Sequence, residues 1–411
     1  MHNRRAAMAF ILITLFLDVL GIGIVIPILP ELIKEFIGGD ASLAASYYGP
    51  LIAAYALMQF LFAPVLGALS DRFGRRPLIL IALFGLGVDY LIQGFAPTIG
   101  WLFVGRILAG VMGASITTAH AYIADISTPE NRSRNFGLVG AAFGIGFIIG
   151  PALGGVLGGL WIRLPFFVAA TLALLNLFYG LLILPESLKP ERRDSFSWAK
   201  ANPVSSIVAL RGFPLVAGLA ASFVLVSLAY RGLESVWVLY TGFRFGWAEL
   251  ANGLTLGLVG VMAVVVQGFL IQPTIARLGE HRAILIGVAI SAISLLLYGL
   301  AFQAWMILAV IVAAAPSQIA GPAIQGLVVG SVPSDQQGKV QGALTSLISL
   351  TSIGAPLLFT TILFSYFTSG MAPVTLPGAP FYLGSVLIFA ALLLLVRLFR
   401  HRPSAEPMVT G

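Results

Sequence analysis

Five ionisable side chains lie inside apolar stretches that are long enough to cross a lipid bilayer. They are Asp18, Asp89, Arg106, Arg231 and Glu234. Charged groups at membrane depth are costly, and they usually mark a pathway for ions or substrate. Their presence predicts a protein that moves a solute across a membrane and uses protons to do so.

Asp18 and Arg106 could serve proton exchange together, Asp18 as the exchanging group and Arg106 as a fixed charge. Asp18 lies ten residues into the first apolar stretch, about 15 Å deep at 1.5 Å rise per residue. Burial there disfavours the charged carboxylate, so Asp18 could exchange a proton; alternatively, it caps a helix kink at Gly21 and Gly23. Arg106 keeps its charge and would tune a neighbouring carboxylate, with Asp18 as the expected partner. Its alternative role is that of an arginine extending to the membrane interface.

The other ionisable groups leave structural and functional interpretations open. Asp89 could serve transport or a packing hydrogen bond, and His120 could relay protons, although a packing histidine is favoured. Arg231 and Glu234 are three residues apart, so they can pair on one helical face. Either the pair only neutralises itself, or Glu234 is a second protonation or cation site across a cavity from Asp18.

Composition predicts a membrane protein with twelve spans. Only 9% of the 411 residues are charged, whereas soluble domains carry about a quarter. Without cysteine there is no disulfide framework or thiolate site, and without a nucleotide loop, metal cluster or nucleophile arrangement we expect neither an enzyme nor a bound cofactor. The first span has no cleavage signal and is expected to be retained. The predicted spans are 8–30, 46–69, 78–97, 101–124, 134–158, 165–184, 214–240, 248–272, 283–302, 305–330, 338–364 and 380–399.

The positive charge predicts the orientation of these spans. With both termini in the cytoplasm, eighteen of the 23 Lys and Arg residues fall on or beside cytoplasmic segments, as the positive-inside rule requires. The net charge of +7 therefore reports membrane topology, and we expect no nucleic-acid partner. The exceptions are Lys34, Arg163 and Arg244 on the outer side and Arg106 and Arg231 within spans.

The sequence repeats at half its length. Arg72-Phe73-Gly74 is echoed 205 residues later by Arg277-Leu278-Gly279, and Pro151 is echoed by Pro356 at the same offset. Duplicated halves are a known transporter design. The predicted organisation is a six-helix bundle over 1–185, a cytoplasmic central loop over 186–213 and a second six-helix bundle over 214–411.

Two motifs resemble signatures of the major facilitator superfamily. Residues 67–77 read GALSDRFGRRP and resemble the superfamily's loop between spans two and three, which forms charge contacts that close the cytoplasmic side. The GPALGG run from Gly150 resembles its fifth-helix antiporter signature, which bends at the interface between halves. The resemblance implies gating roles for Gly67, Asp71, Arg72, Gly74, Arg75, Arg76, Gly150 and Pro151, and we expect Asp125 to join this gate.

Longer stretches resemble bacterial tetracycline/proton antiporters, among them LDVLGIGIVIPILP from Leu17 and VWVLYTGFRFGW from Val236. This resemblance implies an all-α major facilitator fold in the bacterial inner membrane. It also implies a monomeric, proton-coupled exporter of tetracycline-like or other amphipathic drugs that works by alternating access. The drug could travel as a complex with a divalent metal.

The resemblance fails at two positions. Ala263 and Ser291 stand where tetracycline exporters carry a histidine and an acid that couple transport to protons. Either the coupling is rearranged or the substrate is not tetracycline. A separate alternative is a facilitator or symporter for a small nutrient, lipid or metabolite, against which the Gly-Pro run of span five argues. The candidate substrate-binding residues are Tyr55, Gln59, Trp237, Gln267 and Gln325, whose rings and amides could stack on and orient a planar drug.

Overall fold

A computed structural model describes residues 2–113, 115–188, 191, 193, 214–332 and 337–400. Within these ranges the chain is helical without strands, and twelve helices are long and apolar enough to cross a membrane. The all-α fold with twelve spans is therefore confirmed. Most of the predicted central loop, 186–213, and the tail after residue 400 lie outside the described residues.

The spans before residue 184 are built from α-helices. They are α1 (His2–Val25) with the short α2 (Leu29–Ile37), α3 (Ala41–Phe73), α4 (Arg75–Gly94), α5 (Ile99–Gly113) with α6 (Ser115–Ile126), α7 (Pro129–Leu160) and α8 (Leu164–Ile183).

Three later spans change helical geometry partway, which the apolar pattern did not predict. A π-helical segment, η3, follows α11, a 3₁₀ segment, η4, follows α14, and a nine-residue π-helix, η5, follows α16. Two of these segments include a proline, Pro316 in η4 and Pro356 in η5, which cannot donate a helical hydrogen bond. The elements are α10 (Pro214–Phe245), α11 (Glu249–Val265), η3 (Val266–Leu270), α12 (Ile271–Leu278), α13 (Glu280–Leu300), α14 (Ala304–Ala314), η4 (Ala315–Ile319), α15 (Ala320–Gly330), α16 (Gln337–Ala355), η5 (Pro356–Phe364), α17 (Ser365–Thr368) and α18 (Ala379–Arg400).

The connection between α3 and α4 is shorter than predicted. Gly74 is the only residue between the two helices, so the expected loop over 67–77 is mostly helix. Its φ of +104° lies in the region that favours glycine. Gly279, at the matching junction between α12 and α13, has a φ of +76°. The two halves thus repeat the same turn.

The start of α3 carries a side-chain cap. Asp40 precedes the helix and accepts hydrogen bonds from the backbone N–H groups of Leu43, at 3.0 Å, and Ser42, at 2.7 Å. The Leu43 N–H and the Ser42 hydroxyl hold the pKa of the Asp40 carboxyl below its ordinary value because they stabilise the charged form.

Small residues allow α7 to contact helices of both halves. Gly150 and Pro151 lie against Gly23 of α1, and the Pro151 carbonyl lies against Gly253 of α11. A side chain on Gly253 would collide with this backbone. The GPALGG run therefore lies at the interface between halves, as the sequence predicts. The helix remains continuous through Pro151.

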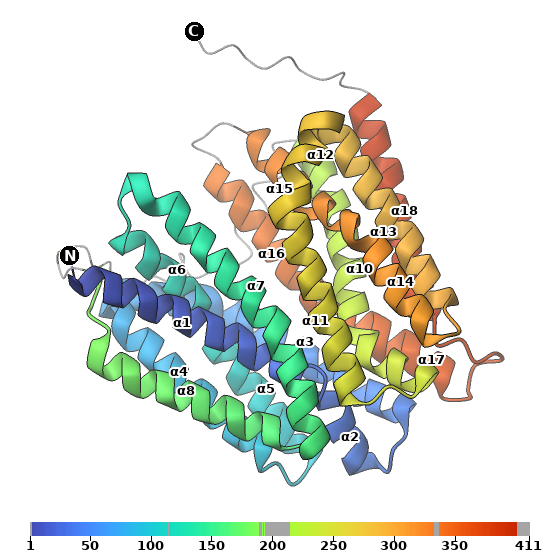
Figure 1. Cartoon of the computed structure of the whole chain (residues 1–411), viewed down its shortest axis with the longest axis horizontal. Coiled ribbons are helices and arrows are strands. Elements are labelled where there is room, and N and C mark those ends of the chain that lie inside the picture. The colour runs from blue at the N-terminus through green and yellow to red at the C-terminus, as the bar shows by residue number, and fades with distance from the viewer. Residues whose placement is uncertain are drawn as a thin grey trace.

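The contact between α7 and α11 exists at one end of the molecule and disappears toward the other. Gly155 packs on the backbone of Glu249. Gly144 is much farther from α11, because a Cβ atom added to it would lie 3.8 Å from the Val264 side chain. Gly137, seven residues before Gly144 on the same helical face, has no neighbour within 4 Å. The ribbons diverge in the same direction, toward the start of α7 and α12 (Figure 1). We call this diverging end, which also holds the α3–α4 junction, the Arg75 end.

Candidate functional site

Asp18, Asp89 and Arg106 meet around a small cavity inside the first half. The cavity has a volume of about 20 Å³, and Tyr55 and Tyr90 also line it. A volume of this size holds about one water molecule. Helices α1, α3, α4 and α5 each contribute a lining residue, so the charged groups predicted from three separate spans converge on one point.

Arg106 pairs with Asp89 and not with Asp18. Arg106 Nη2 lies 3.9 Å from Asp89 Oδ2, and the two side chains are 8% and 0% exposed. Gln93 donates to Asp89 Oδ1 at 2.7 Å, and the Arg106 guanidinium lies 5.7 Å from the Tyr55 ring. The expected Asp18–Arg106 pair was wrong because the spacing within a helix does not fix which neighbouring helix the guanidinium faces.

Asp18 is left as the carboxylate without a partner. It is half-buried and lines the small cavity. Among the described residues no group donates a hydrogen bond to it or forms an ion pair with it. Arg106 balances the charge of Asp89, and Gln93 donates a hydrogen bond to it. Of the two carboxylates, Asp18 is therefore the one that lines the cavity without a neighbouring charge among the described residues to balance its own.

A much larger cavity of about 460 Å³ opens in the second half. Its lining comes from α10, α11, α13, η4 and their neighbours, and only Phe147 comes from the first half. Among its described lining residues only Arg231 and Glu234 are charged. Arg231 donates to Glu234 Oε2 at 2.7 Å, which confirms that the two residues pair. Their side chains remain 44% and 52% exposed.

Polar groups without charge complete the lining of the large cavity. The Tyr230 hydroxyl lies 2.8 Å from the Ser291 hydroxyl and 3.1 Å from the Ser317 hydroxyl. Trp237 is 4% exposed, and its indole N–H finds no acceptor within the described part of the chain. Ala263, like Ser291, also lines the cavity. Both positions at which the tetracycline-exporter resemblance fails therefore border the same space.

The remaining candidate binding residues are more scattered. Gln59 lies 3.4 Å from the Tyr55 hydroxyl and 3.5 Å from the Gly113 carbonyl, beside the small cavity. Gln267 is exposed on η3 and Gln325 is half-buried on α15. Neither amide lines the two cavities. Of the five predicted residues, only Trp237 borders the large cavity.

His120 has the packing environment that the sequence favoured. Its ring lies 6.4 Å from the Phe143 ring in a stacked arrangement and 6.0 Å from the Phe136 ring, both on α7. It lines neither cavity.

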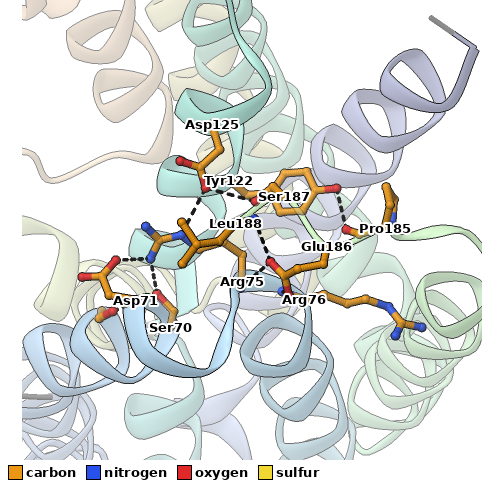
Figure 2. Close-up of polar contacts among 11 residues, drawn as sticks. Ser70, Asp71, Arg75, Arg76, Tyr122, Asp125, Pro185, Glu186, Ser187 and Leu188 are labelled. Atoms are coloured by element: carbon orange, nitrogen blue, oxygen red, sulfur yellow. Dashed lines mark hydrogen bonds and ion pairs between the residues drawn. The ribbon is translucent and has the colours of Figure 1, made fainter. Parts of the chain in front are cut away.

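A polar cluster surrounds Arg75 at the α3–α4 junction (Figure 2). Arg75 pairs with Asp71 at 2.5 Å and with Asp125 of α6 at 3.3 Å, and it donates to the Ser70 hydroxyl. Asp71 and Asp125 thus contact the same arginine, and their role in a gate stays a prediction. Arg72 instead lies over the Phe73 ring, and Gly67 has open space beside it.

Glu186 is a part of this cluster that sequence reasoning missed. Its carboxylate accepts from the backbone N–H groups of Arg75 at 2.9 Å, Arg76 at 3.2 Å and Leu188 at 3.0 Å (Figure 2). Gly74 has no side chain with which to cap α4, so Glu186 caps the helix from 111 residues away. The only sequence signal is an acid directly after the sixth span.

The described members of the cluster all belong to the first half. Arg76 donates to the Leu181 carbonyl at 2.9 Å, the Tyr122 hydroxyl to the Pro185 carbonyl at 2.8 Å, and the Ser187 hydroxyl to Asp125 at 3.0 Å. Every partner drawn in Figure 2 lies between residues 70 and 188. In the conformation observed, these charges connect α3, α4, α6 and the segment after α8, and among the described residues none of the bonds named here reaches the second half.

Known proteins resemble this chain over most of its length. The family model of the Major Facilitator Superfamily matches residues 11–356. The chain is 42% identical to the tetracycline resistance protein, class C, of Escherichia coli, covering 92% of this chain and 94% of the relative. It is 34% identical to the class H protein of Pasteurella multocida, with 97% of both chains covered.

A solved structure supports the fold independently of close sequence similarity. The crystal structure of the human organic anion transporter MFSD10 (TETRAN) covers 95% of this chain and 99% of its own, with a TM-score of 0.69 and 24% identity. With the family model matched over most of the sequence, the chain belongs to the major facilitator superfamily and is a multi-pass membrane transporter.

Proposed function

We propose that the protein is a proton-coupled efflux antiporter that exports tetracycline-like or other amphipathic drugs by alternating access. Its similarity to tetracycline resistance proteins over nearly the whole chain supports this function. The observation that carries the coupling is the difference between the two carboxylates at the small cavity. Asp89 is compensated by Arg106, whereas Asp18 has no partner among the described residues.

In this mechanism Asp18 exchanges the proton. Deprotonated, Asp18 adds a negative charge at the small cavity and favours binding of a drug that carries positive charge, free or as a metal complex. Protonation removes that charge and weakens binding. A proton on Asp18 and a bound drug then exclude one another. The transporter therefore changes conformation in one direction with drug bound and in the other with Asp18 protonated, which gives exchange.

The observed conformation suits the stage at which drug enters. We propose that the Arg75 end faces the cytoplasm, that both termini are cytoplasmic, and that the protein lies in a bacterial inner membrane as a monomer. The halves touch where Gly155 meets Glu249 and separate toward the Arg75 end. The large cavity would then be reached from the cytoplasm.

Alternating access needs a second arrangement with the opposite end open. The Arg75 cluster would then meet the second half and close the cytoplasmic side. Gly253 and Gly155 would lose their contacts across the α7–α11 interface.

The test is proton release by purified, detergent-solubilised protein in weakly buffered solution. We expect tetracycline with magnesium, or an active compound from a panel of lipophilic cations, to release protons from the wild type. D18N, which mimics the protonated carboxyl, should bind drug more weakly than the wild type and without releasing protons. D40N is the matched control, because it makes the same change outside the spans and asparagine also caps helices well.

The possible results separate the functions. Proton release from D18N equal to that of the wild type would exclude Asp18 as the exchanging group. Drug binding without proton release from the wild type would favour a facilitator. Release only with compounds other than tetracycline would keep the antiporter and exclude tetracycline as its substrate.

A further inference from the structure

The side chains of Arg231 and Glu234 are exposed to the large cavity, whereas those of a similar ion pair on α2 are mostly covered. Glu31 and Lys34 of α2 have the same spacing and the same 2.7 Å separation, yet their side chains are only 19% and 17% exposed. Arg231 and Glu234 are 44% and 52% exposed, and both line the large cavity. The charged ends of this second pair are therefore accessible to a molecule in the cavity.

The pair has much unused hydrogen-bonding capacity. A guanidinium has five N–H donors, and a carboxylate has about four acceptor positions. Within the described part of the chain, Arg231 and Glu234 use one of each, in their bond to one another. Each can bind a second charged group without breaking that bond.

The pair also has little structural work to do. Both residues are on α10, three positions apart, so their bond connects no two helices. An exposed ion pair within one helix adds little stability, whereas charge within a membrane span is costly. Stability alone gives no reason for the pair, which suggests a ligand.

Neighbouring groups extend the pair into a binding surface. Trp237 follows Glu234 by three residues and lines the same cavity, with a buried indole N–H that lacks an acceptor among the described residues. The hydroxyls of Tyr230, Ser291 and Ser317 form a small cluster in the lining of the same cavity. The rest of the lining is mostly apolar, as is typical of sites for drug-sized ligands.

We propose that this surface selects zwitterionic amphipathic substrates, which carry an ammonium group and an anionic oxygen a few ångströms apart. Arg231 would donate to the anionic oxygen, Glu234 would accept from the ammonium, and the Trp237 N–H would donate to a neutral oxygen. The proposal rests on the proposed function and names the substrate class of the same transporter.

The charge balance of the cavity explains the selectivity. Its described lining carries one positive and one negative charge, so a zwitterion satisfies both charges and leaves the cavity neutral. A simple cation meets Glu234 but also Arg231, which repels it. Discrimination thus comes from repulsion as well as attraction.

The experiment measures equilibrium binding to the purified full chain without divalent metal. The probes are tetracycline and its analogue that lacks the dimethylamino group, so only one carries an ammonium. We expect the wild type to bind tetracycline about tenfold or more tightly than the analogue, the factor of one charge-assisted hydrogen bond. R231Q/E234Q should bind the two probes nearly equally.

Two further variants separate recognition from a merely self-neutralising pair. R231E/E234R can still form an ion pair but presents each charge at the wrong position, so tetracycline binding should weaken about tenfold or more. E31Q/K34Q removes the matched pair outside the cavity and should keep wild-type binding.

Each contrary result has a distinct meaning. If the wild type binds tetracycline and R231Q/E234Q keeps the same preference over the analogue, the inference is overturned while the antiporter function stands. Undiminished binding by R231E/E234R would also overturn it. If the wild type binds neither probe, the inference is overturned, because the pair then recognises no metal-free zwitterion; proton release with tetracycline and magnesium still decides the antiporter function.

Discussion

The pairing of Arg106 with Asp89 makes a quantitative prediction. If the two residues form a buried neutral unit, removing either charge must strand the other inside the protein. R106Q and D89N should each be strongly destabilising. Removing both charges should cost much less, because neither charge is then left alone and the amide introduced by D89N can still accept from Gln93.

The magnitude follows from the separation and the burial. At 3.9 Å and an effective dielectric constant of about 20, two unit charges attract by about 4 kcal/mol. Breaking a buried pair on one side costs about 3–5 kcal/mol in other proteins, so we expect a loss of that size in each single variant. For R106Q/D89N we expect a loss of about 1–2 kcal/mol, hence a coupling energy of several kcal/mol.

The assay is a double-mutant cycle of unfolding free energies, from titrating the purified protein in mixed micelles with a denaturing detergent. Substrate-induced proton release by the double variant is a second readout. It should persist because Asp18 is intact. Additive effects of the two single variants, within about 0.5 kcal/mol, would refute the pairing. Loss of proton release from a folded double variant would refute the assignment of exchange to Asp18 alone.

Three further predictions concern other parts of the fold. E186A should lower the free energy of unfolding by about 1–3 kcal/mol because α4 loses its cap, and E186Q, which keeps an acceptor, should lower it less; equal losses in thermal melting curves would contradict the capping role. The pKa of Asp40 is lowered in the folded state. Its contribution to stability is therefore complete above the ordinary pKa of about 3.9 and is lost as the pH falls through the folded pKa. D40N should flatten this part of the plot of melting temperature against pH, and an unchanged plot would exclude the effect. G253V should prevent close packing of α7 on α11 and favour the conformation in which the Arg75 end is closed. Spin labels at G137C and G268C, in a chain with no other cysteine, should then lie closer together. An unchanged distribution of distances between the labels would contradict this.

Much of the architecture could be predicted because it depends on local patterns. Apolar runs gave twelve spans, and the repeat of Gly74 at Gly279 correctly indicated the same turn in each half. The spacing of Arg231 and Glu234 was enough to predict their ion pair, because both partners lie on one helix. In each case the residues that decide the outcome are close together in the sequence or repeat at a fixed interval.

Contacts between distant spans could not be predicted in the same way. The partner of Arg106 depends on how α4 and α5 are rotated about their axes, which the spacing of residues within either helix does not record. Gln267 and Gln325 were placed in the binding site by residue type, but neither side chain lines either cavity. The roles proposed for Asp18, Glu234 and Trp237 in transport stay predictions until the variants are measured.

The cap that Glu186 places on α4 has a consequence for biosynthesis. The backbone N–H groups of Arg75 and Arg76 find their carboxylate only after 110 further residues have been made. Five more helical elements, α4 to α8, must leave the ribosome before it appears. Until then the start of the third span depends on water or lipid headgroups, so the first half completes its tertiary structure only when its sixth span has been inserted. A nascent chain stalled just short of this glutamate would hold all six spans while the third still lacks its cap.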